Sequence, residues 1–177
     1  MQHLISQQNL EQCQQLVTEQ GWYKVANVCQ GGRRRQDSVA VGLSRLGHCD
    51  WVVIHDGTRP LVTVDLIEQG LEVAKETGAA AAAVPVTDTI KVVGDDIIVH
   101  ETPPRQNLWA VQTPQIFSLN IITQAYHRAN GSVTDDASLV EQLGYKVKLY
   151  MGSYDNIKIT TPDDMVLGEI LLQRHGR

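Results

Sequence analysis

The sequence contains few cysteines, and none of them is placed to form a metal site or a disulfide framework. Cys13, Cys29 and Cys49 are odd in number and far apart, without a Cys-x-x-Cys pair or a histidine at zinc-ligand spacing. We therefore expect reduced, buried thiols in a cytoplasmic protein.

Long apolar runs and excess positive charge are also missing. No stretch approaches about 18 consecutive apolar residues, and no signal-peptide core follows Met1. The net charge of -5 gives no general attraction for a polyanion. The one basic cluster, Arg33 to Arg35, is interpreted as a solvated loop or helix start that can help to hold phosphate. These features predict a soluble protein that is not exported and whose partners include neither a membrane nor a nucleic acid.

The sequence also lacks the short motifs of several enzyme classes. It has no Gly-x-Gly-x-x-Gly, no Gly-x-x-x-x-Gly-Lys-Ser/Thr, no Gly-x-Ser-x-Gly and no His-Glu-x-x-His. Hydride transfer, P-loop chemistry and triad hydrolysis therefore have no support. The six histidines are scattered, and we interpret each as a surface residue or a satisfied core residue.

What the sequence does contain is an alternation of apolar strands and amphipathic helices. This pattern, over 177 residues, predicts one α/β domain with a doubly wound, mostly parallel sheet. Met1 to Ser6 resembles the end of a strand entering a helix, so we expect the chain to begin inside a βαβ unit. We expect strands over 23–29, 51–54, 79–86, 146–150 and 157–159, and helices over 7–20, 34–46, 63–78, 119–129, 134–143 and from 161 onward.

Residues 87–105 interrupt this alternation. Within them, two β-type runs flank Gly94-Asp95-Asp96, which is typical of a hairpin. A two-stranded arm has too little core to be stable alone, so we expect it to project and to pack on a second subunit.

Polar segments follow the expected strands, where ligands bind in open α/β sheets. Asp56 and Arg59 follow the strand over 51–54. Asp56 can meet Mg²⁺ or hydroxyl groups and Arg59 can bind phosphate, or the two can form an internal pair that fixes the loop. Gly31 and Gly32 can let a ligand approach the backbone. Lys158 lies between two isoleucines and either needs an anion or faces solvent from an edge strand.

Further polar segments lie around Arg105 and Thr113, and at Thr134-Asp135-Asp136-Ala137-Ser138, where Thr134 is the expected helix cap. Taken in order, six motifs resemble the 2-C-methyl-D-erythritol 4-phosphate cytidylyltransferases. They are Gly-Gly-x-x-Arg-Gln-Asp-Ser-Val, His-Asp-Gly-Thr-Arg-Pro, Pro-Val-Thr-Asp-Thr-Ile-Lys, Leu-Trp-Ala-Val-Gln-Thr-Pro-Gln, Thr-Asp-Asp-Ala-Ser and Asp-Asn-Ile-Lys-Ile-Thr.

The resemblance implies a Rossmann-like fold, a cytoplasmic or plastid-stromal enzyme, and a homodimer formed by exchanged arms. The implied reaction is Mg²⁺-dependent attack of the substrate phosphate on the α-phosphate of CTP, with catalytic roles for Lys158 and Asp56 and metal contact at Asp56. The implied nucleotide-binding residues are Gly31, Gly32, Ser38, Asp56 and Gly57. The implied substrate-binding residues are Asp56, Arg59, Thr113, Thr134 and Lys158, with Thr89 and Arg105 reaching the site from the partner's arm.

The sequence departs from this family most seriously at one loop, with smaller departures at Gly57-Thr58 and Arg33. The family's Ala-Ala-Gly-x-Gly-x-Arg loop and the lysine after it are absent, a gap of roughly one or two βαβ units of about 30 residues. We therefore expect an N-terminally shortened nucleotidyltransferase domain with little turnover. Two alternatives stay open: a cytidylyltransferase for a polyol phosphate such as ribitol 5-phosphate, and an inactive remnant that dimerises through the arm.

Overall fold

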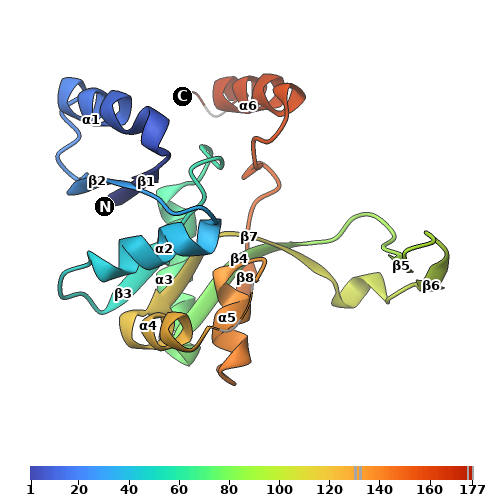
Figure 1. The fold of residues 1–177 in the computed structure, drawn as a ribbon. Helices are drawn as coiled ribbons and strands as arrows, with labels where there is room; N and C mark the ends of the chain where they lie inside the picture. Colours follow the sequence, from blue (N-terminus) through green and yellow to red (C-terminus); the bar gives the residue numbers. More distant parts are fainter. Residues whose placement is uncertain (130, 132, 175, 177) are drawn as a thin grey trace. The chain divides into compact units, whose positions relative to one another are not determined.

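The computed structural model describes residues 1–129, 131, 133–174 and 176, which form an α/β fold of two compact units (Figure 1). The first unit contains residues 1–52 and 118–144, and the second contains residues 53–117 and 145–177. The predicted α/β class is confirmed, because strands joined in parallel alternate with helices along the chain.

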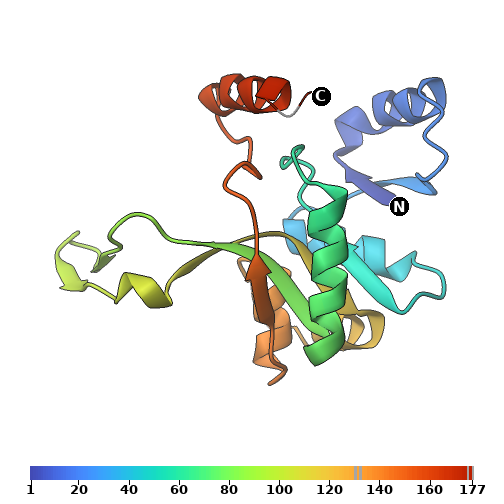
Figure 2. The same cartoon turned by 180° about the vertical axis from the view of Figure 1, so that it is seen from behind.

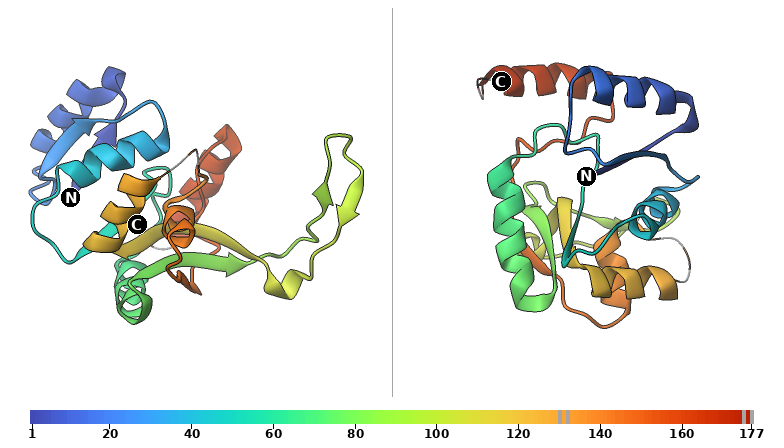
Figure 3. Two further views of the ribbon diagram at one scale, coloured as in Figure 1. Left: turned by 60° about the horizontal axis from the view of Figure 1, so that its bottom comes forward. Right: turned by 90° about the vertical axis from the view of Figure 1, so that its left-hand side faces the viewer.

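The first unit is built on a two-stranded parallel sheet. Its strands pair in register from Gln2 opposite Asn27 to Ile5 opposite Gln30. Helix α1 packs on β2 and helix α2 packs on β1, on opposite sides of the pair (Figures 1 and 3). The elements of this unit are β1 (Gln2–Ile5), α1 (Leu10–Glu19) after a short 3-10 turn (Gln7–Asn9), β2 (Asn27–Gln30), α2 (Arg35–Ser44), α4 (Leu119–Arg128) and α5 (Asp136–Gln142).

The second unit is organised by a four-stranded sheet with the strand order β3-β7-β4-β8. Strands β4 and β8 are parallel, whereas β4 and β7 are antiparallel. The elements are β3 (Trp51–Ile54), which spans the boundary between the units, α3 (Val64–Thr77), β4 (Ala79–Pro85), β7 (Trp109–Ser118), β8 (Lys148–Met151) and α6 (Pro162–Arg174).

Small residues set the spacing between α3 and the sheet. All five alanines of Ala79–Ala83 are fully buried in β4, and α3 lies along this strand (Figure 2). On the helix, Gly70 and Ala74 are the buried residues that allow this approach, together with Leu66. The helix begins at Thr63, whose hydroxyl accepts from the Leu66 N–H, and ends at Gly78 with φ of 80°. Both ends were predicted from the sequence.

The predicted arm is a hairpin that projects from the β4–β7 pair (Figures 1 and 3). Strand β5 (Val92–Val93) pairs antiparallel with β6 (Val99–Glu101), and a 3-10 turn (Arg105–Asn107) leads back to β7. The paired segments are short and fully exposed, so this hairpin buries no core of its own.

The structure corrects several local expectations. The strand expected over 23–29 is β2 and begins only at Asn27, because residues 21–25 form hydrogen-bonded turns. Residues 157–159 are not a strand. Strand β7 was not predicted at all. Cys13 and Cys49 are only partly buried, although Cys29 is fully buried and all three are free thiols.

The close contact of α3 with the sheet predicts the effect of enlarging Gly70. A β-carbon there would lie 2.4 Å from Tyr150 Oη and from Ile116 Cδ1. We expect Gly70→Val to lower the free energy of unfolding by about 2 kcal/mol through overpacking, since valine brings little gain in helix propensity over glycine. Urea denaturation measures this loss. Gly47→Val is the control, because its β-carbon meets nothing within 4 Å. Equal stability of the two variants would contradict the packing argument.

Candidate active site

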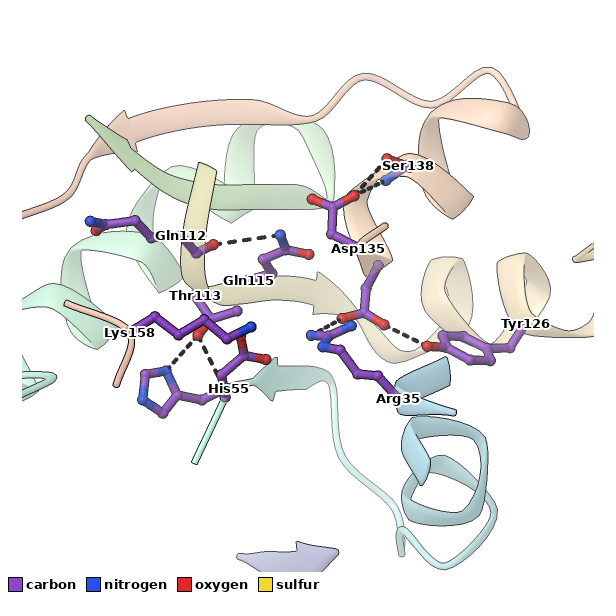
Figure 4. Close-up of polar contacts among 11 residues, drawn as sticks. Arg35, His55, Gln112, Thr113, Gln115, Tyr126, Asp135, Ser138 and Lys158 are labelled. Atoms are coloured by element: carbon purple, nitrogen blue, oxygen red, sulfur yellow. Dashed lines mark hydrogen bonds and ion pairs between the residues drawn. The ribbon is translucent and has the colours of Figure 1, made fainter. Parts of the chain in front are cut away.

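The turn after β3 is attached to β7 through one hydroxyl group. The backbone N–H of Asp56 donates to Thr113 Oγ1 at 3.0 Å, and the same oxygen lies 3.0 Å from His55 Nδ1 (Figure 4). His55 Nε2 lies 2.9 Å from the carbonyl oxygen of Arg59. One nitrogen of the imidazole ring therefore contacts Thr113 and the other contacts the Arg59 carbonyl, so the same ring holds both ends of the turn.

The hydrogen bonds and the burial of His55 together favour one neutral tautomer. A carbonyl oxygen can only accept a hydrogen bond, so Nε2 is protonated and donates to the Arg59 carbonyl. The Thr113 hydroxyl then donates to the unprotonated Nδ1 while it accepts from the Asp56 N–H. Burial lowers the pKa of His55, which favours this neutral form.

Lys158 and Asp56 form an ion pair beside this turn. Lys158 Nζ lies 3.0 Å from Asp56 Oδ2, and the side chains are 44% and 15% exposed. The expected anion for Lys158 is therefore present within the protein, and the ammonium group is still open to solvent. Lys158 is held in a loop rather than in the edge strand that the sequence suggested, with the Ile159 N–H donating to the Thr58 carbonyl at 2.8 Å.

Arg59 is oriented by a buried asparagine. Its Nη1 donates to the carbonyl oxygen of Asn156 at 2.7 Å, and burial lowers the pKa of Arg59. The Asn156 side chain is 1% exposed and donates to the Thr113 carbonyl at 2.9 Å and to Gln112 Oε1 at 3.2 Å. Asp56, Arg59, Thr113 and Lys158 are thus brought together in the second unit.

The glycine pair and Ser38 come together in the first unit. The Gly31 N–H donates to the Ile5 carbonyl at 2.9 Å, and the Gly32 N–H donates to Ser38 Oγ at 3.0 Å. A β-carbon at Gly32 would lie 2.2 Å from Asp37 Cβ, so glycine is required for the loop to fold back on the first turn of α2.

Thr134 also lies in the first unit and is exposed. It does not cap the following helix as expected: Asp135 does, with Oδ1 accepting from the Ser138 N–H at 3.0 Å. A carboxylate is a stronger acceptor than a hydroxyl group for this purpose.

Thr89 and Arg105 both lie in the arm segment, and both are exposed. Arg105 Nη1 donates to the Thr87 carbonyl at 2.7 Å, across the base of the arm. Gly57 lies in the turn after Asp56, and a β-carbon there would meet nothing within 4 Å.

The sequence interpretation missed several residues that support these groups. His55 was treated as one of six scattered histidines, and Asn156 was quoted only within a motif. Arg35 was assigned to a solvated basic cluster, yet it pairs with the buried Asp136. The available signal was that all of these residues belong to motifs that also supply candidate ligand-binding residues.

Neither a metal cluster nor a membrane span is found in the part of the chain that the structure describes. Within it, no three His, Cys, Asp or Glu side chains gather as a metal site. No helix among the same residues is long and apolar enough to cross a bilayer.

Comparison with known proteins connects this geometry to one enzyme family. Residues 2–174 match the family described as IspD: 2-C-methyl-D-erythritol 4-phosphate cytidylyltransferase. The enzyme of that name from Dehalococcoides mccartyi strain 195 is 49% identical over 171 residues, which cover 97% of this chain and 75% of that protein.

Solved structures agree with this match. The 4-diphosphocytidyl-2C-methyl-D-erythritol synthase of Anaerococcus prevotii superposes with a TM-score of 0.88 at 30% identity, over 97% of this chain and 80% of that one. The 2-C-methyl-D-erythritol 4-phosphate cytidylyltransferase of Thermus thermophilus superposes with a TM-score of 0.75 at 36% identity, over 84% and 74% of the two chains. This chain therefore belongs to the 2-C-methyl-D-erythritol 4-phosphate cytidylyltransferase family, whose members are nucleotidyltransferases.

Proposed function

We propose that this chain transfers CMP from CTP to 2-C-methyl-D-erythritol 4-phosphate and releases pyrophosphate. The observation that supports it best is the grouping of two cations, Arg59 and Lys158, around Asp56 and Thr113 at the end of β3, in a chain of this family. A phosphate monoester needs such cations, and a sugar-alcohol chain needs carboxylate and hydroxyl partners.

The substrate phosphate is the nucleophile in this proposal. One of its oxygens attacks the α-phosphorus of CTP, a new P–O bond forms, and the bond from that phosphorus to the bridging oxygen of the β-phosphate breaks. Lys158 and Arg59 bind the attacking phosphate and reduce its repulsion from the triphosphate, which is catalysis by position and charge. Asp56, Thr113 and Thr134 complete the substrate contacts.

The exposed Lys158–Asp56 pair suits this role. The Lys158 side chain is 44% exposed, so an entering phosphate can reach its ammonium group and take it from the less exposed Asp56. The freed carboxylate can then accept from a substrate hydroxyl group or contact a metal ion.

We assign Gly31, Gly32 and Ser38 of the first unit, and Asp56 and Gly57 of the second unit, to the nucleotide. The two glycines leave the backbone of their loop uncovered by side chains, so a base and ribose can lie directly against it. We assign Mg²⁺ to Asp56, since Mg²⁺ commonly binds one or two carboxylates together with substrate phosphates and water. When bound, Mg²⁺ supplies positive charge to the triphosphate.

The arm supports a homodimer in a cytoplasmic setting. It exposes apolar side chains of both strands and the turn, with Ile97 80% and Ile98 62% exposed. Covering these residues by a second copy would remove an unfavourable surface, and Thr89 and Arg105 at the base of the arm would enter the partner's site. The free cysteines of the described chain agree with a reducing compartment.

The direct test is pyrophosphate release with CTP and Mg²⁺, comparing 2-C-methyl-D-erythritol 4-phosphate with ribitol 5-phosphate. We expect slow but measurable turnover with methylerythritol phosphate, in keeping with the low turnover expected from the sequence. The kcat/KM should be at least about tenfold lower with ribitol phosphate, since a missing or misplaced hydroxyl contact costs on this scale. Equal use of both substrates would contradict the specificity. No turnover with either substrate would contradict the activity.

Lys158→Ala should separate catalysis from stability. We expect kcat/KM to fall by about 10²–10³-fold, because a cation on the reacting phosphate is lost. The melting temperature should change little, since the pair is exposed. Lys148→Ala is the matched control, because Lys148 forms an exposed ion pair with Glu76 on the same unit. Near-normal turnover of Lys158→Ala would remove Lys158 from the mechanism.

The shared-site dimer predicts complementation between two inactive variants. Lys158→Ala and Arg105→Ala should each be inactive alone. A mixed dimer then has one intact site, made by Lys158 of one protomer and Arg105 of its partner, so equal mixing should restore about a quarter of the sites. Mixing two Lys158→Ala samples is the control. If activity does not return although mixed dimers form, Arg105 acts within its own subunit.

A further inference from the structure

The first residues of two helices are joined by an ion pair in the first unit. Helix α2 begins at Arg35 and helix α5 begins at Asp136. Arg35 Nη2 lies 2.7 Å from Asp136 Oδ2, and Tyr126 of α4 donates its hydroxyl hydrogen to Asp136 Oδ1 (Figure 4). Three helices therefore meet at one carboxylate.

The burial of this carboxylate is unusual for a surface ion pair. The Asp136 side chain is 1% exposed, whereas the Arg35 side chain is 35% exposed. Burying a charge is costly, and a buried pair often stabilises a fold no better than apolar residues of similar volume would. What such a pair does provide is fixed geometry, because Arg35 cannot leave without depriving the buried Asp136 carboxylate of its cation.

The two joined helix starts carry two different parts of the proposed site. Arg35 follows Gly31 and Gly32 and precedes Ser38, the segment assigned to the nucleotide. Asp136 follows Thr134, a residue assigned to the substrate. Each segment is also held by its own hydrogen bond, from the Gly32 N–H to Ser38 Oγ and from the Ser138 N–H to Asp135 Oδ1.

We infer that Arg35, Asp136 and Tyr126 are positioning residues that hold the nucleotide segment (Gly31 to Ser38) and the substrate segment (Thr134 to Ser138) at a fixed separation. The assignment of these segments to their ligands rests on the proposed function; the connection between them rests on the ion pair. None of the three residues is assigned a ligand contact. They act through the backbone at Gly32 and Thr134, so that each segment is in place only when the other is.

Tyr126 is kept in its donor form at this site. Burial first, and then the charge of Asp136 and the hydrogen bond to it, raise the pKa of the Tyr126 hydroxyl. The phenol therefore remains protonated throughout the working range of the enzyme. Tyr126→Phe removes this one hydrogen bond with little change in volume, which makes it the mildest variant of the set.

The test is a crossed effect on the Michaelis constants. Arg35 belongs to the nucleotide segment, and we expect Arg35→Gln to raise the KM for methylerythritol phosphate by about tenfold. Asp136 belongs to the substrate segment, and we expect Asp136→Asn to raise the KM for CTP by a similar factor. The KM values of the double variant should not exceed those of the more impaired single variant, since the two residues act as one unit. Glu72→Gln, which removes an exposed pair with Lys75 on α3, is the control.

Amide hydrogen exchange tests the connection without activity. Arg35→Lys should speed exchange at the Ser138 N–H on α5, and Tyr126→Phe should speed exchange at the Gly32 N–H before α2, while the amides of α3 keep their rates. These variants serve even if Asp136→Asn does not fold. If each substitution affects only its own helix in exchange and only its own ligand in KM, the inference is wrong. If the unsubstituted chain releases no pyrophosphate, the proposed function fails, and the exchange measurement alone decides the connection.

Discussion

The hydroxyl group of Thr113 is the contact on which the site of the second unit depends. It accepts from the Asp56 backbone and donates to His55, so it attaches the turn after β3 to the neighbouring strand β7. The other ring nitrogen of His55 contacts the Arg59 carbonyl. The Thr113 carbonyl accepts from the Asn156 side chain, and the Asn156 backbone carbonyl orients the Arg59 guanidinium. Removing the hydroxyl would free the Asp56 N–H and His55 Nδ1 from β7, while Arg59 would still be held through Asn156.

The polar residues around Thr113 explain why strand β7 was not predicted from the sequence. Gln112, Thr113, Pro114 and Gln115 are polar or lack an N–H group, and a proline normally argues against a central strand. In the structure these residues are buried, and their polar groups are satisfied by distant partners such as Ser153 and Asn156. Local sequence cannot show such pairing, since the partners lie some 40 residues away. The reverse error occurred at Ile157 to Ile159, where an apolar alternation is held as a loop.

The helices and the apolar strands were predictable because their signals are local. Thr63 and Gly78 bound α3 by capping, and the buried alanines of β4 form an uninterrupted apolar run. Within the site, Asp56, Arg59, Thr113 and Lys158 were identified by motif and are brought together. His55 was not, because its role arises from hydrogen bonds to Thr113 and to a backbone carbonyl. A histidine in a motif gives no sign of which atoms its ring nitrogens will meet.

Burial separates the Lys158–Asp56 and Arg35–Asp136 ion pairs by function. The Lys158 side chain is 44% exposed, so a phosphate from solvent can reach its ammonium group and replace the Asp56 carboxylate. Opening the Arg35–Asp136 pair would instead leave a carboxylate that is 1% exposed without its cation, a penalty of about 3–5 kcal/mol. The same chemical pairing is therefore exchangeable in one place and fixed in the other. An exchangeable pair suits ligand binding and a fixed one suits positioning, so solvent exposure assigns the roles where residue type alone does not.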